Sequence, residues 1–394
     1  MSIPTPPPMP KPDSPDYWKE LRAQFPMPPD EAYCNTGTIG VSPIRVINAM
    51  YQHVLTANTN AAHIDWREDG QALLSGYAPY VEIREKLGKL INTEYQNIAL
   101  IQNATMGMNL LANGLEIPKD AEILTTDIEH PGGRSGWELH SRRHGSKHRM
   151  VKIPRNIDGP AEIVAAFDQA ITPDTYLMSF PHISSAQGIK FPAHELAKLA
   201  KEHEIFSVVD GAQTPGHIKI DVQKINCDAY YGSPHKWLMA PAGNGFLYIN
   251  PRRADEVWTT LASSQWDNHE DNGYRLGQRG TGNPSLLVGL EEALDFHFEI
   301  GPTRVYKRIK ELGDRLRKGL SELPNVELIT PLDMAAGLTT FKVKDIPGIE
   351  VQHQLWTRGK IQPRALSEGG IRYSTHIYNN TDEVDRSLEI IKQL

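Results

Sequence analysis

The stretch 205–237 constrains the fold more than any other part of the chain. Residues 205–209 form a short apolar run rich in β-branched side chains, which is typical of a buried strand, and the run ends at Asp210. A second strand-like run, 228–231, ends in a turn that carries Lys236. In open α/β sheets, ligands bind beyond the carboxyl ends of the strands. The stretch therefore predicts such a sheet, with an acid and a lysine delivered to its binding edge.

An alternation of strands and helices extends this pattern over most of the chain. Helical patterns of about a dozen residues separate the strand-like runs, so we expect right-handed crossovers and a mostly parallel sheet. The fold class is therefore α/β. Strands are expected at 98–101, 122–125, 176–180, 205–209, 228–231, 245–249, 326–329 and 339–343, and helices at 16–25, 43–56, 80–91, 102–114, 161–171, 193–202, 287–300, 303–320 and 382–394.

The character of the chain changes near residue 285, where long helical patterns replace the alternation. We expect an N-terminal arm and short helix at 1–30, a large domain at 31–285 and a smaller α+β domain at 286–394. The N-terminal segment is expected to pack on the small domain. Residues 1–14 are rich in proline, which fixes φ and lacks an N–H group, so they predict an extended or disordered arm.

Charge and cysteine content exclude several classes of protein. The 394 residues carry a net charge of -7, which leaves no basic surplus for binding nucleic acid. Two cysteines cannot build a disulfide framework, so we expect a reducing, cytoplasmic compartment. No apolar run approaches the roughly 18 residues that would span a bilayer, so no membrane association is expected. No signal peptide is visible, and a leader removed from the chain is left open.

Lys236 and Asp210 are the first candidates for chemistry. A lone lysine is usually a solvated charge, and an aspartate at a strand end often caps a turn. A lysine in the setting Ser-Pro-His-Lys-Trp is expected to have a lowered pKa, because desolvation disfavours the ammonium. An amine of that kind and a carboxylate facing a pyridinium nitrogen suit pyridoxal 5′-phosphate (PLP). Gln213 could donate to the phenolic oxygen of the same ring.

A strand-to-helix turn at Ala104 and Thr105 is a candidate seat for the phosphate of this cofactor. Free N–H groups and the helix dipole favour an anion there, although threonine at a helix start is usually only a cap. Ser233 and His235 flank the lysine closely enough to reach the same phosphate. His130 follows a strand end, and is either a loop histidine or an imidazole stacked on the cofactor ring that shuttles protons.

Arg372 and two loops complete the candidates. The arginine is either an ordinary salt-bridge partner or a planar fork for a substrate carboxylate. The loop 31–42 either feeds the following helix or returns over the active site, and the sequence does not choose between these. The loop 63–70 reads as a surface loop, with substrate contact as the alternative. We also expect the loop 262–278 to contribute to substrate selectivity.

These residues resemble the class V aminotransferase group of fold-type-I PLP enzymes, which includes cysteine desulfurases, isopenicillin N epimerase-like proteins and kynureninase-like enzymes. The resemblance rests first on SVVDGAQ (207–213) and CDAYYGSPHKW (227–237). Supporting motifs are YCNTGTIGVSP (33–43), QNAT (102–105), DIEHPGG (127–133), HISSAQG (182–188), RGTGNP (279–284) and IRYSTHIYNNTDEVDR (371–386). It implies a large domain with a mostly parallel sheet of the seven-stranded type, and a homodimer with active sites at the interface.

The resemblance also implies a role for each matching position. Lys236 is the Schiff-base lysine, and Asp210 and Gln213 pair with the ring nitrogen and ring hydroxyl. His130 stacks on the ring, and Arg372 binds the α-carboxylate of an amino-acid substrate, helped by Asn35 or Ser185. The implied phosphate ligands are Ala104, Thr105, Ser233 and His235, with Thr281 reaching the phosphate of the neighbouring subunit.

One departure from the family pattern reduces the number of reactions that we expect of this chain. Cysteine desulfurases carry a mobile-loop cysteine upstream of the matching arginine, but residues 359–370 contain none, and Cys34 and Cys227 lie elsewhere. A persulfide-forming desulfurase is therefore disfavoured, as is a non-catalytic binding protein, because Lys236, Asp210 and Arg372 are all retained. The sequence favours an isopenicillin N epimerase-like enzyme acting at Cα, either an epimerase or racemase or a β-elimination (C–S) lyase. Transamination is the alternative.

Overall fold

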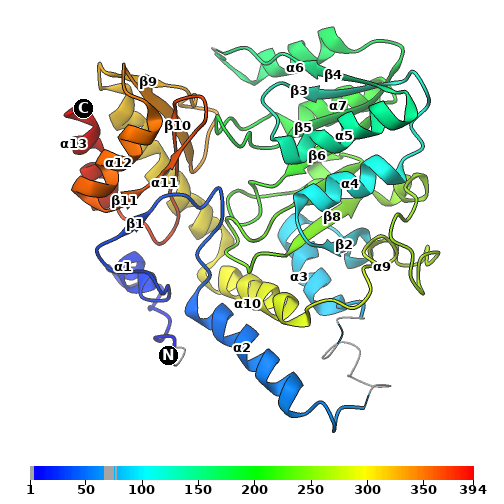
Figure 1. The fold of residues 1–394 in the computed structure, drawn as a ribbon, viewed down its shortest axis with the longest axis horizontal. Helices are drawn as coiled ribbons and strands as arrows, with labels where there is room; N and C mark the ends of the chain where they lie inside the picture. The colour runs from blue at the N-terminus through cyan, green and yellow to red at the C-terminus, as the bar shows by residue number, and fades with distance from the viewer. Residues whose placement is uncertain (1–3, 66–74, 76–77, 156) are drawn as a thin grey trace.

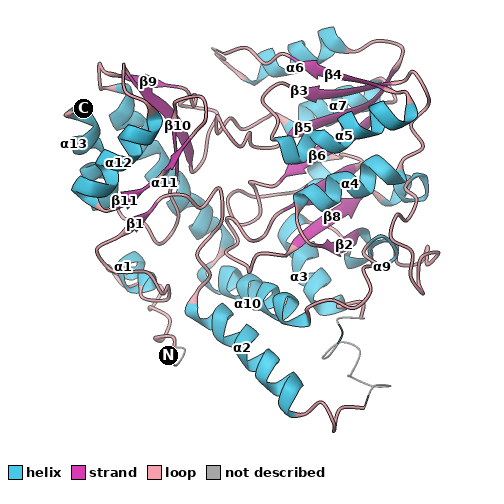
Figure 2. Cartoon of the chain, viewed as in Figure 1, coloured by secondary structure: helices cyan, strands magenta, loops and turns pink. Residues whose placement is uncertain are grey.

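A computed structural model describes residues 4–65, 75, 78–155 and 157–394 (Figure 1). The strands form one large sheet and two smaller ones, as Figure 2 shows. The large sheet has seven strands in the order β2-β8-β7-β6-β5-β3-β4, and β8 runs in the opposite direction to the other six. These strands are β2 (Ile98–Ile101), β3 (Glu122–Thr126), β4 (Lys147–Val151), β5 (Thr175–Pro181), β6 (Phe206–Gly211), β7 (Ala229–Gly232) and β8 (Gly245–Ile249).

Helices cover both faces of this sheet (Figure 1). Strand β2 shows why: Ile98 and Leu100 belong to one apolar cluster, and Ala99 and Ile101 belong to another. Successive side chains of a strand point to opposite faces, so a sheet covered on both faces has continuous apolar runs. The helices of this part of the chain are α2 (Ile44–Thr59), α3 (Val81–Ile91), α4 (Ala104–Gly114), α5 (Pro131–His144), α6 (Pro160–Ala170), α7 (Ala193–Glu202), α8 (Val222–Ile225), α9 (Asn272–Leu276) and α10 (Pro284–Ile300), with 3-10 turns η2 (Tyr95–Asn97) and η3 (Pro251–Glu256).

The C-terminal part builds a separate four-stranded antiparallel sheet in the order β12-β13-β10-β9. Its apolar cluster joins these strands to the helices beside them, and a short parallel pair, β1 with β11, adds residues 32–33 to the same region. The elements here are α1 (Tyr17–Arg22), β1 (Ala32–Tyr33), α11 (Pro302–Ser321), β9 (Val326–Leu328), β10 (Leu338–Val343), α12 (Gly348–Gly359), β11 (Ile361–Gln362), β12 (Arg364–Ala365), β13 (Ile371–Ser374) and α13 (Thr381–Lys392). The predicted division at residue 285 stays a prediction.

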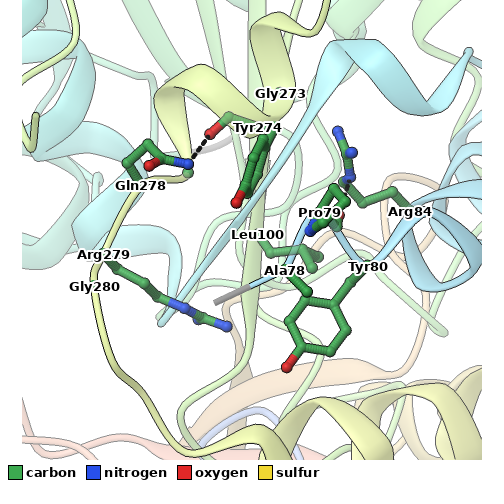
Figure 3. Close-up of a pocket in the computed structure, with 11 residues that line it drawn as sticks. Ala78, Pro79, Tyr80, Arg84, Leu100, Gly273, Tyr274, Gln278, Arg279 and Gly280 are labelled. Carbon is green, nitrogen blue, oxygen red and sulfur yellow. Dashed lines mark hydrogen bonds between the residues drawn. The ribbon is translucent and has the colours of Figure 1, made fainter. Parts of the chain in front are cut away.

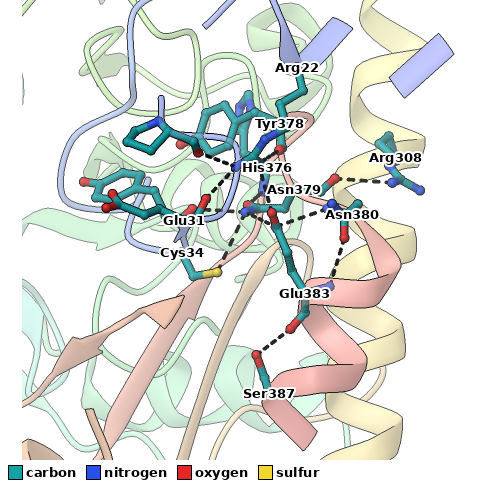
Figure 4. Close-up of polar contacts among 12 residues, drawn as sticks. Arg22, Glu31, Cys34, Arg308, His376, Tyr378, Asn379, Asn380, Glu383 and Ser387 are labelled. Carbon is teal, nitrogen blue, oxygen red and sulfur yellow. Dashed lines mark hydrogen bonds and ion pairs between the residues drawn. The ribbon is translucent and has the colours of Figure 1, made fainter. Parts of the chain in front are cut away.

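The N-terminal segment packs on the C-terminal region, as the sequence predicted. Arg22 at the end of α1 pairs with the carboxylate of Glu383 at 2.9 Å and donates to the carbonyl oxygen of Tyr378 at 2.5 Å (Figure 4). Glu383 also accepts a hydrogen bond from Asn379 at 2.9 Å. Residues 4–14 form no helix or strand, and the carbonyl oxygen of Pro7 accepts a 2.8 Å hydrogen bond from a glutamine beyond α1. This anchoring fixes where the following loop enters the active-site region.

Several elements were not predicted from the sequence, and each has a weak local pattern. Helix α5 begins with Pro-Gly-Gly, and strand β4 is an edge strand with the mostly polar sequence KHRMV. Helix α12 and the short strands β11 and β12 were also missed. Along the described residues, no helix combines the length and the apolar character that crossing a membrane requires.

Candidate active site

A cavity of about 270 Å³ lies where the carboxyl ends of several strands of the large sheet meet. Because Asp210 pairs with Tyr231 and Gly211 with Gly232, β6 and β7 end at the same level of the sheet. The segments that follow them therefore reach one edge. The cavity is lined by Gly37, Thr38, Asn103, Ala104, Thr105, Glu129, His130, Gly132, Ile183, Ser185, Asp210, Ala212, Gln213, Ser233, His235, Lys236 and Arg364.

Lys236 and Asp210 both face this cavity. Burial lowers the pKa of Lys236 to about 8, against the opposing pull of Asp210, while Arg372 and Arg364 lower it further. This confirms the lowered pKa that the sequence predicted. Burial also raises the pKa of Asp210, although its Oδ1 accepts a 2.7 Å hydrogen bond from the Ala212 amide. The two groups form a buried amine and carboxyl pair at the binding edge of the sheet.

Glu129 is a buried acid at the site that the sequence did not single out. Its Oε1 accepts a 2.7 Å hydrogen bond from the backbone of His130, and its Oε2 has no hydrogen-bond partner among the residues described. Burial, and then the charge of Asp210, hold the pKa of Glu129 well above its usual range. This raised pKa favours the neutral form of the carboxyl group. The only local signal was its place beside His130, which predicts nothing by itself.

His130 caps the N-terminus of α5 with its side chain. Its Nδ1 accepts a 3.0 Å hydrogen bond from the Gly132 amide, so in the neutral ring the proton sits on Nε2. Burial, then Lys236 and nearby arginines, lower the pKa of His130. The ring is therefore neutral at pH 7 and lies at the exposed mouth of the cavity.

The N-terminus of α4 meets the segment after β7 on one side of the cavity. Ser233 Oγ accepts a 3.1 Å hydrogen bond from the Ala104 amide. Thr105 is exposed at the helix start, and a Cβ on Gly132 would lie 2.6 Å from its Oγ1, so glycine leaves that hydroxyl free of steric overlap. His235 also lines the cavity, and burial lowers the pKa of its imidazole. An exposed hydroxyl at the N-terminus of an 11-residue helix favours an anion.

Gln213 lines the cavity but its amide is engaged. Its Nε2 donates to the carbonyl oxygen of Gly37 at 2.9 Å and approaches Ser185 Oγ at 3.4 Å, and its Oε1 accepts from the Trp237 indole at 2.8 Å. In this structure Gln213 ties the N-terminal loop to the lysine-bearing segment. Its predicted contact with a cofactor ring hydroxyl stays a prediction.

The N-terminal loop returns to the cavity, which decides between the two alternatives that the sequence left open. Gly37 and Thr38 line the cavity, and the Gly40 amide donates to the carbonyl oxygen of His235 at 2.8 Å. A Cβ on Gly40 would lie 2.0 Å from the carbonyl oxygen of Lys236. Glycine is therefore required where the loop passes over the lysine.

The structure places Arg372 behind the cavity wall instead of on it. Its side chain is buried, and its fork donates to the carbonyl oxygen of Ser185 at 3.0 Å, to Asn35 Oδ1 at 3.1 Å and to Thr38 Oγ1 at 2.8 Å. Both predicted helpers, Asn35 and Ser185, thus contact it. Arg364, which the sequence did not single out, is the arginine that lines the cavity.

Other predicted positions lie away from this cavity. Thr281 is exposed and does not line it. Residues 66–70 of the predicted loop 63–70 lie outside the described residues. The loop 262–278 contains α9 and contributes Tyr274 to a separate cavity beside Tyr80 and Arg279 (Figure 3). That cavity measures about 30 Å³, which is about the volume of one water molecule, and the predicted role of the loop in substrate selectivity stays a prediction.

Comparison with known proteins identifies the family to which this chain belongs. The family model for aminotransferase class-V matches residues 40–386. The chain belongs to the aminotransferase class-V family. It is 32% identical over 399 residues to an isopenicillin N epimerase of Streptomyces clavuligerus, covering 96% of this chain and 98% of the relative. It is 28% identical over 400 residues to a probable cysteine desulfurase of Pyrococcus abyssi, covering 95% and 97%.

A solved structure agrees with this family assignment. It is a lysine-to-alanine mutant of C-DES with glycine covalently linked to the PLP cofactor, and it superimposes with a TM-score of 0.85 at 25% identity, covering 95% of this chain and 99% of that one. The class-V chain described here therefore has the predicted fold-type-I architecture and is a PLP-dependent enzyme. Its specific reaction is the subject of the proposal that follows.

Proposed function

We propose that this enzyme removes the proton from Cα of an amino acid or amino-acid derivative and returns a proton to that carbon, so that it acts as an epimerase or racemase. The observation that carries the proposal is the position of Lys236 and Asp210 in one cavity, with the pKa of the lysine lowered to about 8. The 32% identical relative is an isopenicillin N epimerase, which supports the same outcome.

The donor set of the cavity fits PLP. The exposed Thr105 hydroxyl and the amides at the start of α4, with Ser233 and His235 beside them, would hold the phosphate. The carboxyl group of Asp210 would face the pyridine nitrogen, and Lys236 would carry the cofactor. When bound, PLP supplies an electron sink that stabilises negative charge on the substrate Cα.

Proton transfer, carboxylate binding and positioning of the cofactor ring depend on residues of the chain itself. Because burial lowers the pKa of Lys236 to about 8, its uncharged amine is more available near neutral pH than that of an ordinary lysine, and it would accept the Cα proton. From the family resemblance, Arg372 is the proposed site for the α-carboxylate. It lies behind the cavity wall in this structure and reaches the cavity lining through its hydrogen bonds to Ser185 and Thr38. His130 is neutral with its Nδ1 occupied, so it serves to position the cofactor ring and not as a strong base.

A β-elimination lyase is the second candidate, and one observation favours it. Epimerisation needs a proton delivered to the opposite face of Cα, whereas elimination needs one base and expels the β-substituent with its bonding electrons. Because Nδ1 of His130 is occupied by the Gly132 amide, Lys236 is the main proton acceptor among the described lining residues. A single base is sufficient for elimination.

The thiols of the chain do not support a persulfide-forming desulfurase. A persulfide requires an accessible thiolate. Cys34 is 3% exposed and Cys227 is fully buried, and burial raises the pKa of both thiols. Residues 359–370, which join α12 to β13, contain no cysteine.

Incubation of the holoenzyme with a panel of L-amino acids in D₂O tests the proposal. Deuterium at Cα together with the D-isomer supports epimerisation, release of a 2-oxo acid and the β-substituent identifies elimination, and amino transfer to a 2-oxo acid identifies transamination. Absence of Cα deuterium from every amino acid, in a protein that binds PLP, contradicts the proposal.

Two variants test the assigned roles. Lys236→Ala should abolish Cα exchange while PLP still binds noncovalently, and an active variant would refute the role of the lysine. Arg372→Ala should raise KM for α-amino acids by about 10- to 100-fold, because a charge-assisted hydrogen bond contributes about 1.5–3 kcal/mol. An unchanged KM would show that the carboxylate binds elsewhere.

We also propose that the enzyme is a homodimer in which Thr281 contacts the phosphate of the neighbouring subunit. This rests on the family resemblance and on the exposed position of Thr281 outside its own cavity. Sedimentation should give a dimer, and Thr281→Ala should weaken PLP binding without loss of the dimer. A monomer with full activity would contradict this arrangement.

A further inference from the structure

Two arginines face each other across neighbouring strands beside the active-site cavity. Arg364 on β12 is the direct partner of Arg372 on β13 in an antiparallel pair. Side chains directly opposite in such a pair lie on the same face, with Cβ atoms about 4.5–5.5 Å apart, and like charges in this position are destabilising. No carboxylate forms an ion pair with either arginine in the part of the chain that the structure describes. Both arginines donate to the Thr38 hydroxyl, Arg364 at 3.0 Å and Arg372 at 2.8 Å.

The two arginines differ in what else they contact. Arg372 is 2% exposed, and its fork is held by the neutral oxygen atoms of Ser185 and Asn35 as well as by Thr38. Arg364 is exposed and lines the cavity, and among the described residues its side chain makes one hydrogen bond, from Nη1 to Thr38. A guanidinium carries five N–H donors, so most of those of Arg364 are available to a ligand.

None of the anions assigned to the cavity so far is paired with Arg364. In the proposed function, the phosphate of PLP is held at the start of α4, and the α-carboxylate of the substrate is assigned to Arg372. Of the lining acids, Asp210 is assigned to the cofactor ring, and Glu129 accepts a hydrogen bond from the His130 backbone and has a pKa raised by burial. Arg364 then remains as an exposed cation with a planar fork that matches a carboxylate.

We propose that Arg364 binds a second acidic group of the substrate, so that the preferred substrates are amino acids or derivatives that carry a carboxylate away from Cα. This inference rests on the proposed function, because it presumes an amino-acid substrate whose α-carboxylate binds Arg372. It makes Arg364 the residue that selects acidic over neutral side chains.

Matched pairs of amino acids test this selection. The holoenzyme would be titrated with aspartate and asparagine, glutamate and glutamine, and cystine and S-methylcysteine, following both Cα deuterium exchange in D₂O and the absorbance change of the bound cofactor. In the wild type, at least one acidic member should bind ten-fold or more tightly than its neutral counterpart. Arg364→Gln should remove that preference, raising Kd for the acidic member about 10-fold or more and for the neutral member less than three-fold.

Control variants separate the fork from general charge. Arg358→Gln removes an exposed cation from α12 of the same region and should leave the preference unchanged. Arg364→Lys keeps the charge but loses the planar fork, so it should keep only part of the preference.

Three results would overturn the inference while the proposed function stands. In the first, the wild type binds the neutral member of every pair at least as tightly as the acidic member. In the second, Arg364→Gln weakens the binding of acidic and neutral members equally. In the third, Arg364→Gln instead weakens PLP binding, measured as the concentration of PLP needed to reconstitute the apoenzyme. The second would place Arg364 on the α-carboxylate, and the third on the cofactor. Absence of Cα exchange from every amino acid would instead refute the proposed function, and this inference with it.

Discussion

Replacing Lys236 with methionine in the cofactor-free protein should stabilise the fold near neutral pH. Methionine has a similar length but no charge, so the change removes the cost of burying an ammonium group. Lys236 is a buried lysine whose pKa falls from 10.5 to about 8, and burial is the largest cause. At about 1.4 kcal/mol for each pKa unit, the charged form is disfavoured in the folded state by about 3 kcal/mol.

The sign of the pH dependence follows from proton binding. Below about pH 8 the lysine is protonated in both states, and the folded state carries the full cost. Between about pH 8 and 10.5 the unfolded chain binds a proton that the folded chain does not, so the free energy of unfolding rises with pH in this window. The advantage of Lys236→Met over the wild type should therefore shrink by about 2 kcal/mol between pH 7 and pH 9.5.

Urea denaturation of both apoproteins at the two pH values measures this difference. Other titrating groups are common to both proteins, so their contributions cancel. As a control, Lys201→Met removes an exposed lysine from α7 and should give the same difference at pH 7 and pH 9.5. A Lys236→Met protein that is no more stable than the wild type at pH 7, or whose advantage does not change with pH, would refute the burial argument.

Three further predictions follow from named contacts. Asp210→Asn should lower turnover at saturating PLP about 10- to 100-fold, since a hydrogen bond to a charged group contributes about 1.5–3 kcal/mol. Unchanged turnover in steady-state assays would refute the proposed role of Asp210. Gly40→Ala should destabilise the fold by about 1–3 kcal/mol and weaken PLP binding, because its Cβ would lie 2.0 Å from the carbonyl oxygen of Lys236. Thermal unfolding and PLP titration measure the two effects, and wild-type values in both would contradict the prediction. Arg22→Ala should cost about 3–5 kcal/mol in urea denaturation because it leaves Glu383 buried without its ion pair, whereas a loss below 1 kcal/mol would show that the network in Figure 4 contributes little.

The strands that carry the site were predictable because their signal is local. A buried parallel strand such as β6 is a continuous apolar run, and a turn residue directly after it marks its end. Helix α5 lacked this kind of signal, since its Pro-Gly-Gly start reads as a loop. Its cap, His130, was nevertheless singled out, because a histidine after a strand end is visible without the helix that follows.

The sequence alone determined the fold class and the PLP cofactor, and it singled out Lys236 and Asp210 as candidates, because each depends on residues close together in the chain and on a family pattern. Only the tertiary structure decided that the N-terminal loop covers the lysine, and that Arg364 lines the cavity while Arg372 lies behind its wall. The raised pKa of Glu129 was also decided only by the tertiary structure, since it comes from burial and from the nearby charge of Asp210. Contacts between distant segments, and the desolvation that they cause, exist only once the chain has folded.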